Sequence, residues 1–185
     1  MRRVVMGEGK DGKSVVLSDG NSLRSTEFEC RSGKWSFMTE VWGTDGTPLF
    51  PLGNEADPTL EMVSIIPPPG GTRYRILIWP GAKEMSDIEK WISDRGSNFW
   101  EEFHRQSPGL EGSTNPRTGM HYTDTIDYGY FVSGRIDLEL DDGKVVNFKA
   151  GDSYVLKGTR HAWYNPYDEP CIWIVFMVGG SRKKL

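Results

Sequence analysis

The last third of the chain is a succession of short segments with strand-forming composition, each ended by a turn signal. The segments are Tyr128–Ser133, Arg135–Leu140, Lys144–Phe148, Ser153–Leu156 and Ile172–Val178. Asp142-Gly143, which stands between two alternating segments, is a strong signal for a β-hairpin. Short strands at even spacing predict an antiparallel barrel or sandwich.

The composition agrees with a fold made of many short strands. The 185 residues include 22 Gly and 11 Pro, which favour turns over long helices. Aromatic residues make up 12% of the chain, enough to fill a core or to line an apolar pocket. The length suits one domain with a sizeable core, and no linker divides the chain into two.

Charge and hydropathy argue against several classes of partner. The net charge of -4 gives no support for nucleic-acid binding or for a membrane-binding patch. No segment approaches the ~18 apolar residues of a membrane span, and the first residues lack the apolar core of a signal peptide. Cys30 and Cys171 are expected to be free, buried thiols in a reducing compartment. We therefore expect a cytoplasmic protein.

Residues 1–110 predict further strands and a short helical segment. Ser86, with Glu89 three residues later, and Asn98 could each cap a short helix, and Gly96 separates the two. Residues 45–58 and 107–119 are expected to be loops. The predicted strands are Val4–Met6 and Ser14–Leu17, which form a hairpin, residues 35–44, Leu60–Ile66 and Thr72–Trp79.

Two histidines and a carboxylate have a regular spacing near the first of the C-terminal strands. His121 is followed by Asp127 and then, after six intervening residues, by Gly134. His161 follows a Gly-Asp turn about one hairpin later and precedes Asn165. A pattern of this kind places two imidazoles and a carboxylate near one cavity, where they could hold a metal ion or move protons.

The spacing resembles the paired motifs of the cupin superfamily. In the first motif, His121, Asp127 and Gly134 stand at the positions of the first His, the Glu and the closing Gly, whereas Thr123 replaces the second His and Asn115 the opening Gly. The second motif has Lys157 in place of Pro and one residue fewer before the next glycine. Its matching positions are Gly151, Gly158, His161 and Asn165.

The resemblance implies an all-β fold, a cupin-type antiparallel β-barrel or jelly roll with a short helical segment. The chain looks like small single-domain cupins with a long N-terminal extension, some of which accompany natural-product pathways. Residues 1–110 would be an extension of strands and short helices packed on the barrel, and residues 111–185 the core barrel, together treated as one domain. Cupins of this size commonly pair through sheet edges, so a homodimer is expected.

His121, Asp127 and His161 are the candidate site residues, and two chemistries stay open for them. In metal-binding cupins three His and a Glu hold a divalent cation. Two His and one carboxylate still suffice for an iron(II) site, so one Fe, Zn, Mn or Ni ion is one expectation. The alternative is a site without metal, in which a His paired with a carboxylate acts as general base. His121 and Asp127 share strand parity, whereas Asp124 does not and is expected at a turn.

Other polar and aromatic residues are candidates for lining the pocket. Trp163, two residues from His161, is expected at the cavity, and Tyr128, Tyr130 and Tyr154 could donate hydrogen bonds there. Arg75, with Arg73 on the same strand face, would bind an acidic substrate if it points inward; a surface position is the alternative. His104 and Lys157 are expected to have solvated or capping roles.

The function predicted from these residues is that of a small-molecule enzyme. It would carry out proton-transfer chemistry (dehydration, isomerisation or cyclisation) on a largely apolar or aromatic metabolite. His121 or His161 would be the base, its partner the acid, and Asp127 the orienting carboxylate. The first alternative is a metal-dependent oxygenase that uses the same three residues. The second is a non-catalytic, ligand-binding cupin.

Overall fold

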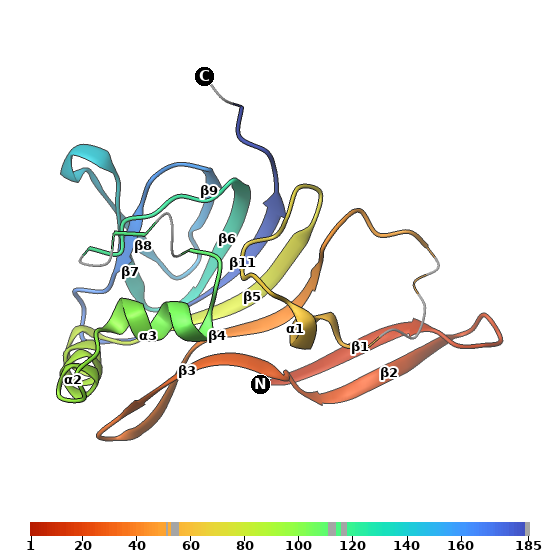
Figure 1. Ribbon diagram of the computed structural model, residues 1–185, viewed down its shortest axis with the longest axis horizontal. Coiled ribbons are helices and arrows are strands. Elements are labelled where there is room, and N and C mark those ends of the chain that lie inside the picture. Colours follow the sequence, from red (N-terminus) through yellow and green to blue (C-terminus); the bar gives the residue numbers. More distant parts are fainter. Residues whose placement is uncertain (51, 53–55, 111–113, 116–117, 184–185) are drawn as a thin grey trace.

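The computed structural model describes residues 1–50, 52, 56–110, 114, 115 and 118–183 (Figure 1). The strands in this part of the chain are β1 (Arg2–Glu8), β2 (Ser14–Asn21), β3 (Arg24–Cys30), β4 (Gly33–Thr44), β5 (Thr72–Trp79), β6 (Thr125–Ser133), β7 (Arg135–Glu139), β8 (Val145–Lys149), β9 (Ser153–Lys157), β10 (Ala162–Tyr164) and β11 (Cys171–Gly179). The helices are α1 (Pro58–Glu61), α2 (Ala82–Ser93), α3 (Phe99–Gln106) and a 3-10 turn, Asp141–Gly143.

The body of the molecule is built from two antiparallel sheets that face each other (Figure 1). The larger sheet has the order β3-β4-β5-β11-β6-β9, and the smaller has the order β10-β7-β8. Phe131 on β6 stacks on Phe148 on β8 with ring centroids 4.9 Å apart, so side chains of the two sheets meet in a shared core. The prediction of an all-β, antiparallel architecture is confirmed.

Strands from both parts of the chain share the larger sheet. β4 pairs with β5, β5 pairs with β11, and β11 pairs with β6. The segment before residue 110 therefore supplies three neighbouring strands of this sheet, whereas the smaller sheet comes from the segment after it. The division at residue 110 remains a prediction.

The hairpin predicted at Asp142-Gly143 joins β7 to β8. Asp142 has a φ of 61° and Gly143 a φ of 70°, and these left-handed values at two successive positions are those of the turns that fit the twist of a two-strand hairpin. The other strands predicted after residue 128 are present, and β10 is an additional short strand. Among the N-terminal predictions, the first hairpin and the strand at 35–44 are confirmed, and β3 was missed.

The helical predictions were partly wrong. Asn98 caps α3 as expected and forms a capping box with Glu101. Helix α2 begins at Ala82 rather than at Ser86, because the chain turns into the helix directly after β5, with Gly81 as N-cap.

The strand predicted at Leu60–Ile66 is absent. Asp57 instead accepts a bond from the Thr59 amide and starts the single turn α1, with Pro58 in its first turn.

The predicted loops at 45–58 and 107–119 lie partly outside the described residues. Cys30 and Cys171 are buried, free thiols, as expected. Within the described part of the chain, no helix has the length and apolarity needed to cross a membrane.

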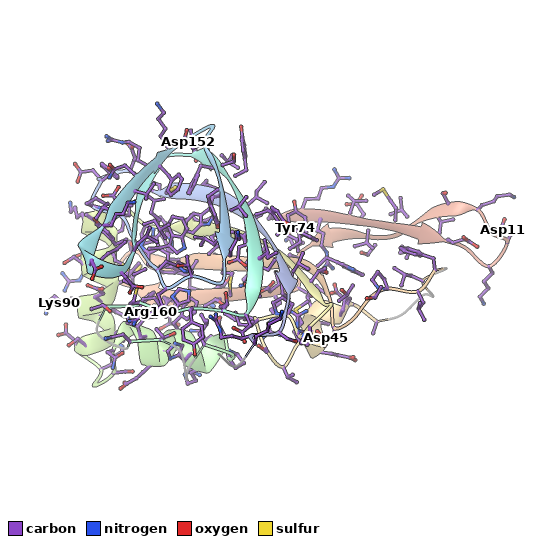
Figure 2. All side chains as sticks on the ribbon, turned by 90° about the horizontal axis from the view of Figure 1, so that it is seen from above. Asp11, Asp45, Tyr74, Lys90, Asp152 and Arg160 are labelled. Carbon is purple, nitrogen blue, oxygen red and sulfur yellow. The ribbon has the colours of Figure 1, made fainter. Side chains whose placement is uncertain are left out.

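The β1–β2 hairpin forms an arm that extends away from the body, with Asp11 near its tip (Figure 2). Every residue of β2 is exposed, and β2 is the one strand of the described chain with which β1 pairs. The base of the arm is fixed to the body by Arg3, which is buried, donates to the Val41 carbonyl at 3.1 Å and is paired with Asp57.

Candidate functional site

The candidate site is a cavity of about 90 Å³ in the core between the two sheets. His121, Asp127, His161 and Trp163 all line it, so the structure brings together residues that are 40 positions apart in the chain. Its other walls are mostly apolar and come from β4, β5, β11 and α3. Since one water occupies ~10–15 Å³ by this measure, the space suits several waters or the reacting end of a small metabolite.

A β-bridge between the two histidines holds one side of the cavity. The amide of His121 donates to the carbonyl of His161, and the amide of His161 donates to the carbonyl of His121, both at 2.9 Å. The imidazole centroids are consequently only 4.4 Å apart, with the ring planes inclined by 52°. The segment before β6 and the segment before β10 thus position the two rings through their backbones.

The hydrogen bonds of the two imidazoles determine their tautomers. Nδ1 of His121 is 2.8 Å from the carbonyl oxygen of Gly119, and Nδ1 of His161 is 2.9 Å from that of Thr159. A carbonyl oxygen only accepts, so each Nδ1 carries a proton and donates it. In the neutral rings the other nitrogen, Nε2, therefore has a free lone pair. Neither Nδ1 bonds to Asp127, which corrects the expectation that Asp127 orients an imidazole.

Both imidazoles are held in the neutral form. Burial and, second to it, the neighbouring His121 together lower the pKa of His161 to about 4, and the bond to the Thr159 carbonyl opposes this shift only in part. Burial also lowers the pKa of His121, against the opposing effect of its bond to Gly119. Two neutral imidazoles with free Nε2 atoms are a pair of proton acceptors in a largely apolar space.

Asp127 is the buried carboxyl group of the cavity. Thr125 Oγ1 donates to Asp127 Oδ1 at 2.5 Å, and the hydroxyls of Thr123 and Thr125 are 2.7 Å apart. The Thr125 hydroxyl donates its one proton to Asp127, so the Thr123 hydroxyl must donate to Thr125. The three inward-facing residues therefore form one chain of hydrogen bonds. Burial raises the pKa of Asp127, while the bond from Thr125 and the charge of Arg75 oppose that shift.

Tyr154 and Trp163 form part of the aromatic wall of the cavity. Their ring centroids lie 5.2 Å apart, and Trp163 is also 6.1 Å from the ring of His161. Tyr154 packs over Gly129, where a Cβ would come within 2.0 Å of its ring, so only glycine leaves this space. Burial raises the pKa of Tyr154, which keeps its hydroxyl protonated.

Arg75 lines the cavity but is already paired. Its side chain is 6% exposed and its Nη2 lies 3.0 Å from Oε1 of Glu40, whose side chain is 1% exposed. The same nitrogen donates to the Ile65 carbonyl. The surface alternative for Arg75 and Arg73 is therefore wrong, since both are buried. Arg73 lies outside the cavity lining and pairs with Asp45 at 2.7 Å.

Tyr128 and Tyr130 do not line this cavity. They are 48% and 51% exposed, because residues adjacent to the inward-facing Asp127 on a strand point to the opposite side. Asp124 is exposed and bonds to Arg182, in agreement with its expected place at a turn. Lys157 is exposed at the end of β9, as expected.

His104, the third histidine, lies on α3 with its ring 6.2 Å from that of Trp100. It is half-buried rather than solvated, and it is not part of the cavity lining.

The metal site that the motif suggested stays a prediction. Among the described residues, no group of three or more His, Cys, Asp or Glu side chains is positioned to hold a metal ion. His121 and His161 lie together, but Asp127 is bonded to Thr125. Thr123 stands where the first cupin motif has its second His, and its hydroxyl belongs to the same chain of hydrogen bonds.

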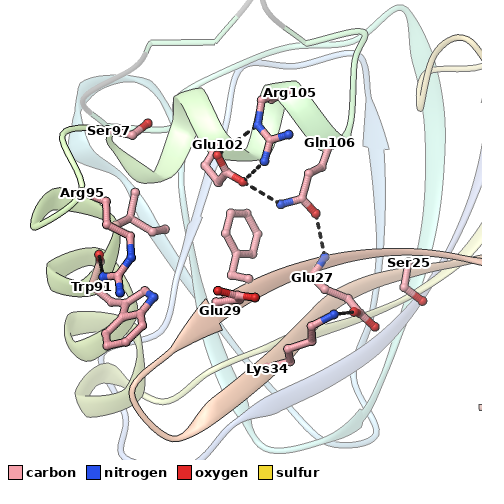
Figure 3. Close-up of a pocket in the computed structure, with 12 residues that line it drawn as sticks. Ser25, Glu27, Glu29, Lys34, Trp91, Arg95, Ser97, Glu102, Arg105 and Gln106 are labelled. Atoms are coloured by element: carbon pink, nitrogen blue, oxygen red, sulfur yellow. Dashed lines mark hydrogen bonds and ion pairs between the residues drawn. The ribbon is translucent and has the colours of Figure 1, made fainter.

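A larger hollow of about 430 Å³ lies outside the barrel core, between β3 and helices α2 and α3 (Figure 3). Four of its charged side chains form two pairs, Arg105 with Glu102 and Lys34 with Glu27. These groups are largely exposed, so water weakens their interactions. The smaller inner cavity is the better candidate, because Asp127 and His161 are buried in it and burial shifts the pKa values of His121, Asp127 and His161.

Sequence reasoning missed several residues that shape the cavity. Thr123 was noted only as a substitution in the motif, and Thr125 was not considered. Both share parity with Asp127, and this was the signal that could have identified them. Glu40 carried no local signal at all, because its role depends on pairing between β4 and β5.

Comparisons with known proteins match the part of the chain that carries the two motifs. The sequence model of the family described as "Cupin domain" matches residues 111–177. A segment of 46 residues is 50% identical to "Phomopsin biosynthesis cluster protein D" from Diaporthe leptostromiformis, covering 25% of this chain and 24% of that protein. A segment of the same length is 41% identical to "Oryzines biosynthesis cluster protein J" from Aspergillus oryzae, covering 25% of this chain and 26% of that protein. The chain thus matches about a quarter of the length of these curated relatives.

Among solved structures, an RmlC-like cupin family protein with a double-stranded beta-helix fold from Methanocaldococcus jannaschii is 13% identical. The alignment covers 58% of this chain and 70% of that one, with a TM-score of 0.36. The family match includes His121, Asp127 and His161 together with β6 to β10. Residues 111–177 therefore carry a cupin domain, and the strands there have the antiparallel arrangement of a jelly roll.

Proposed function

We propose that this protein is a small-molecule enzyme that moves protons on a largely apolar or aromatic metabolite in a natural-product pathway. The observation that carries the proposal is the pair of neutral imidazoles, His161 buried and His121 half-buried, whose Nε2 lone pairs are free in a cavity that the buried Asp127 also lines. The reaction class is dehydration, isomerisation or cyclisation, each of which needs a base and an acid in one site.

The histidine pair acts as the base in this proposal. Nε2 of His121 or His161 accepts a proton from carbon or oxygen of the substrate, while its Nδ1–H stays bonded to a backbone carbonyl. With the rings 4.4 Å apart, a proton on one ring disfavours a second on the other, so the pair takes up one proton as a unit.

Asp127 acts as the acid. Burial raises its pKa and thereby favours the protonated form, which can donate to a leaving hydroxyl or to a carbon. In a dehydration, the base takes the substrate proton, Asp127 gives its proton to the departing hydroxyl, and water leaves. Transfer of the proton from the imidazole back to Asp127 then restores the starting state.

The cavity walls and the relatives support the class of substrate. Apart from its polar groups the cavity is lined by side chains such as Trp79, Trp163 and Trp173, which favour a flat or apolar ligand. Two relatives, each matched by this chain over about a quarter of its own length, are named as proteins of biosynthesis clusters. This resemblance supports a natural-product context.

Isotope labelling tests the proposed reaction against its alternatives. An extract of the producing organism from which this gene has been deleted is incubated with the purified protein in D₂O, or under ¹⁸O₂ in ordinary water. Mass spectrometry is expected to show a product without ¹⁸O, because no oxygen from O₂ enters it. A product of an isomerisation carries deuterium where a deuteron is returned to carbon, whereas a product of a dehydration has lost the mass of one water. Incorporation of ¹⁸O would instead support the oxygenase, and binding without any product would support the ligand-binding cupin.

The pKa of His161 can be measured without a substrate. We expect the imidazole signals of His161 in an NMR titration to shift with a midpoint near pH 4, because burial and His121 both disfavour the cation. The base would therefore stay available down to about pH 5 and be lost as the pH falls through 4. The same sample in urea is the control and should titrate near 6.5. A native midpoint at or above 6.5 would contradict the proposed state of the pair.

A further inference from the structure

One row of inward-facing residues crosses five strands of the larger sheet. Tyr154 on β9 lies opposite Gly129 on β6, which lies opposite Val175 on β11. Val175 lies in turn opposite Arg75 on β5, and Arg75 lies opposite Glu40 on β4. Cross-strand partners point to the same side of a sheet, so the whole row faces the cavity. A Cβ on Gly129 would be 2.7 Å from the Tyr154 hydroxyl oxygen, so this hydroxyl lies over β6 and not at the sheet edge.

Two buried N–H groups near this hydroxyl have no hydrogen-bond partner among the described residues. They are Nε1 of Trp173 and Nε of Arg75, and both residues line the cavity. Trp173 is 1% exposed and precedes Val175 by two positions on β11, so it faces the same side. Burial raises the pKa of Tyr154 and the Trp173 indole opposes that shift, so the two groups are close, although no aligned hydrogen bond joins them. Buried donors are normally paired, so these two call for an acceptor that the chain does not supply.

The proton of the Tyr154 hydroxyl is available to a ligand as well. Burial raises the pKa of Tyr154 and the nearby Asp127 adds to that shift, so the hydroxyl stays protonated. The hydrogen bond that Asp127 Oδ1 accepts comes from Thr125. Trp163 contacts both ends of the site, with ring centroids 5.2 Å from Tyr154 and 6.1 Å from His161. The cavity therefore combines a group of hydrogen-bond donors with the proton-accepting imidazole pair.

We propose that Tyr154 and Trp173 bind the oxygen of a carbonyl group, and that the substrate is an enolisable carbonyl compound. The inference rests on the proposed function, because an imidazole must remove the proton from the carbon next to that carbonyl group. Arg75 is already paired with Glu40 at 3.0 Å, so the donors come without an uncompensated positive charge. A neutral carbonyl group fits such a site, whereas a carboxylate would bring an unpaired charge into a buried space.

The donors act where negative charge develops during the reaction. When Nε2 of an imidazole takes the proton, the electron pair of the C–H bond forms a C=C bond and the carbonyl π pair moves onto oxygen. Tyr154 and Trp173 donate to that oxygen, and fixed donors in a water-poor cavity stabilise such a transition state. The enolate then expels a hydroxyl group from the next carbon, which leaves as water with the proton of Asp127. Alternatively, it takes the imidazole's proton at another carbon and gives an isomer.

Fluorinated phenols test the proposal, because a phenol carries an oxygen on a flat ring as an enol does. In a series of these compounds the acidity rises with fluorine substitution while the size changes little. Calorimetric titration of the full-length protein at neutral pH is expected to show tighter binding of the more acidic members. Tyr154→Phe should weaken binding of the most acidic phenol by roughly 10–100-fold, the range for loss of a hydrogen bond to a charged group. The loss should be smaller for phenol itself.

Three controls accompany this titration. Gly129→Ala keeps the Tyr154 hydroxyl but displaces its ring, because the new Cβ would come within 2.0 Å of it, and should weaken binding in the same direction. Tyr128→Phe removes a hydroxyl from a side chain that is 48% exposed and faces away from the cavity, so it should bind like the wild type. Benzoate, which is charged at neutral pH, should bind more weakly than the phenols.

The proposal is overturned if the wild type binds none of the phenols, if benzoate binds more tightly than they do, or if a folded Tyr154→Phe variant binds the series like the wild type. These results are distinct from those of the isotope-labelling experiment. Product formation together with phenol binding that does not depend on Tyr154 would leave the proton-transfer function and remove the carbonyl site. Phenol binding that depends on Tyr154, without any product, would leave the oxygen-binding site and remove the proposed function.

Discussion

Alanine at His161 or at His121 should lower kcat/KM for the reaction found in the isotope-labelling experiment by roughly 10²–10⁴-fold, the range for loss of a general acid or base. Each substitution removes a free Nε2 lone pair from the cavity. In His121→Ala the remaining His161 also becomes easier to protonate, because His121 no longer opposes its charge. The measurement is product formation at substrate concentrations well below KM, at neutral pH, with each variant compared to the wild type.

Two further measurements separate this loss from structural damage and from metal chemistry. Asp127→Asn keeps the size of the side chain but removes the acid, so it should also be slow, whereas Tyr130→Phe outside the cavity should be fully active. Treatment with a strong chelator should leave the wild-type rate unchanged. Wild-type rates in the alanine variants would show that the histidines do not take part in catalysis. A reversible loss of activity on chelation would instead support the metal-dependent alternative.

Glu40→Ala should lower the free energy of unfolding by about 3–5 kcal/mol, the range for breaking a buried ion pair by removing one partner. Glu40 and Arg75 are both almost fully buried, and they lie opposite each other on β4 and β5. The contact is an ion pair rather than an aligned hydrogen bond, since neither Glu40 oxygen has a hydrogen-bond partner. Without Glu40 the guanidinium would remain as an uncompensated charge in the core.

The matched control for this prediction is the double variant Glu40→Met with Arg75→Met. Removing both charges leaves none unpaired, so the double variant should be far more stable than Glu40→Ala and close to the wild type. Urea unfolding followed by circular dichroism measures all three proteins, with the slope showing whether the transition stays two-state. If Glu40→Ala unfolds like the wild type, the ion pair between Glu40 and Arg75 does not stabilise the fold.

The sequence predicted those parts of the site that depend on local spacing. His121, Asp127 and His161 were found because the order of histidine, carboxylate and turn glycine is regular along the chain. Tyr128 and Tyr130 were wrongly placed in the pocket, although strand parity was sufficient to exclude them. Once Asp127 faces inward, its immediate neighbour must face outward.

The features that were missed depend on contacts between distant segments. Arg75 was given a surface alternative because its partner, Glu40, lies on another strand and becomes a neighbour only through the register of β4 and β5. The orienting role assigned to Asp127 was wrong for a similar reason, since the Nδ1 protons go to backbone carbonyls whose direction no side-chain pattern reveals. Ser86 carried a valid capping pattern, but the preceding strand fixed an earlier start for α2.

The bridge between His121 and His161 is made by main-chain atoms, so it does not depend on which side chains these two positions carry. A substitution at either position can therefore replace the chemical group in the cavity without breaking the backbone hydrogen bonds between the two segments. In evolutionary terms, such a scaffold allows catalytic groups to be gained, lost or replaced one at a time. Thr123, which stands at the other histidine position of the first motif, would then record one such replacement, with its hydroxyl now part of the chain that ends on Asp127.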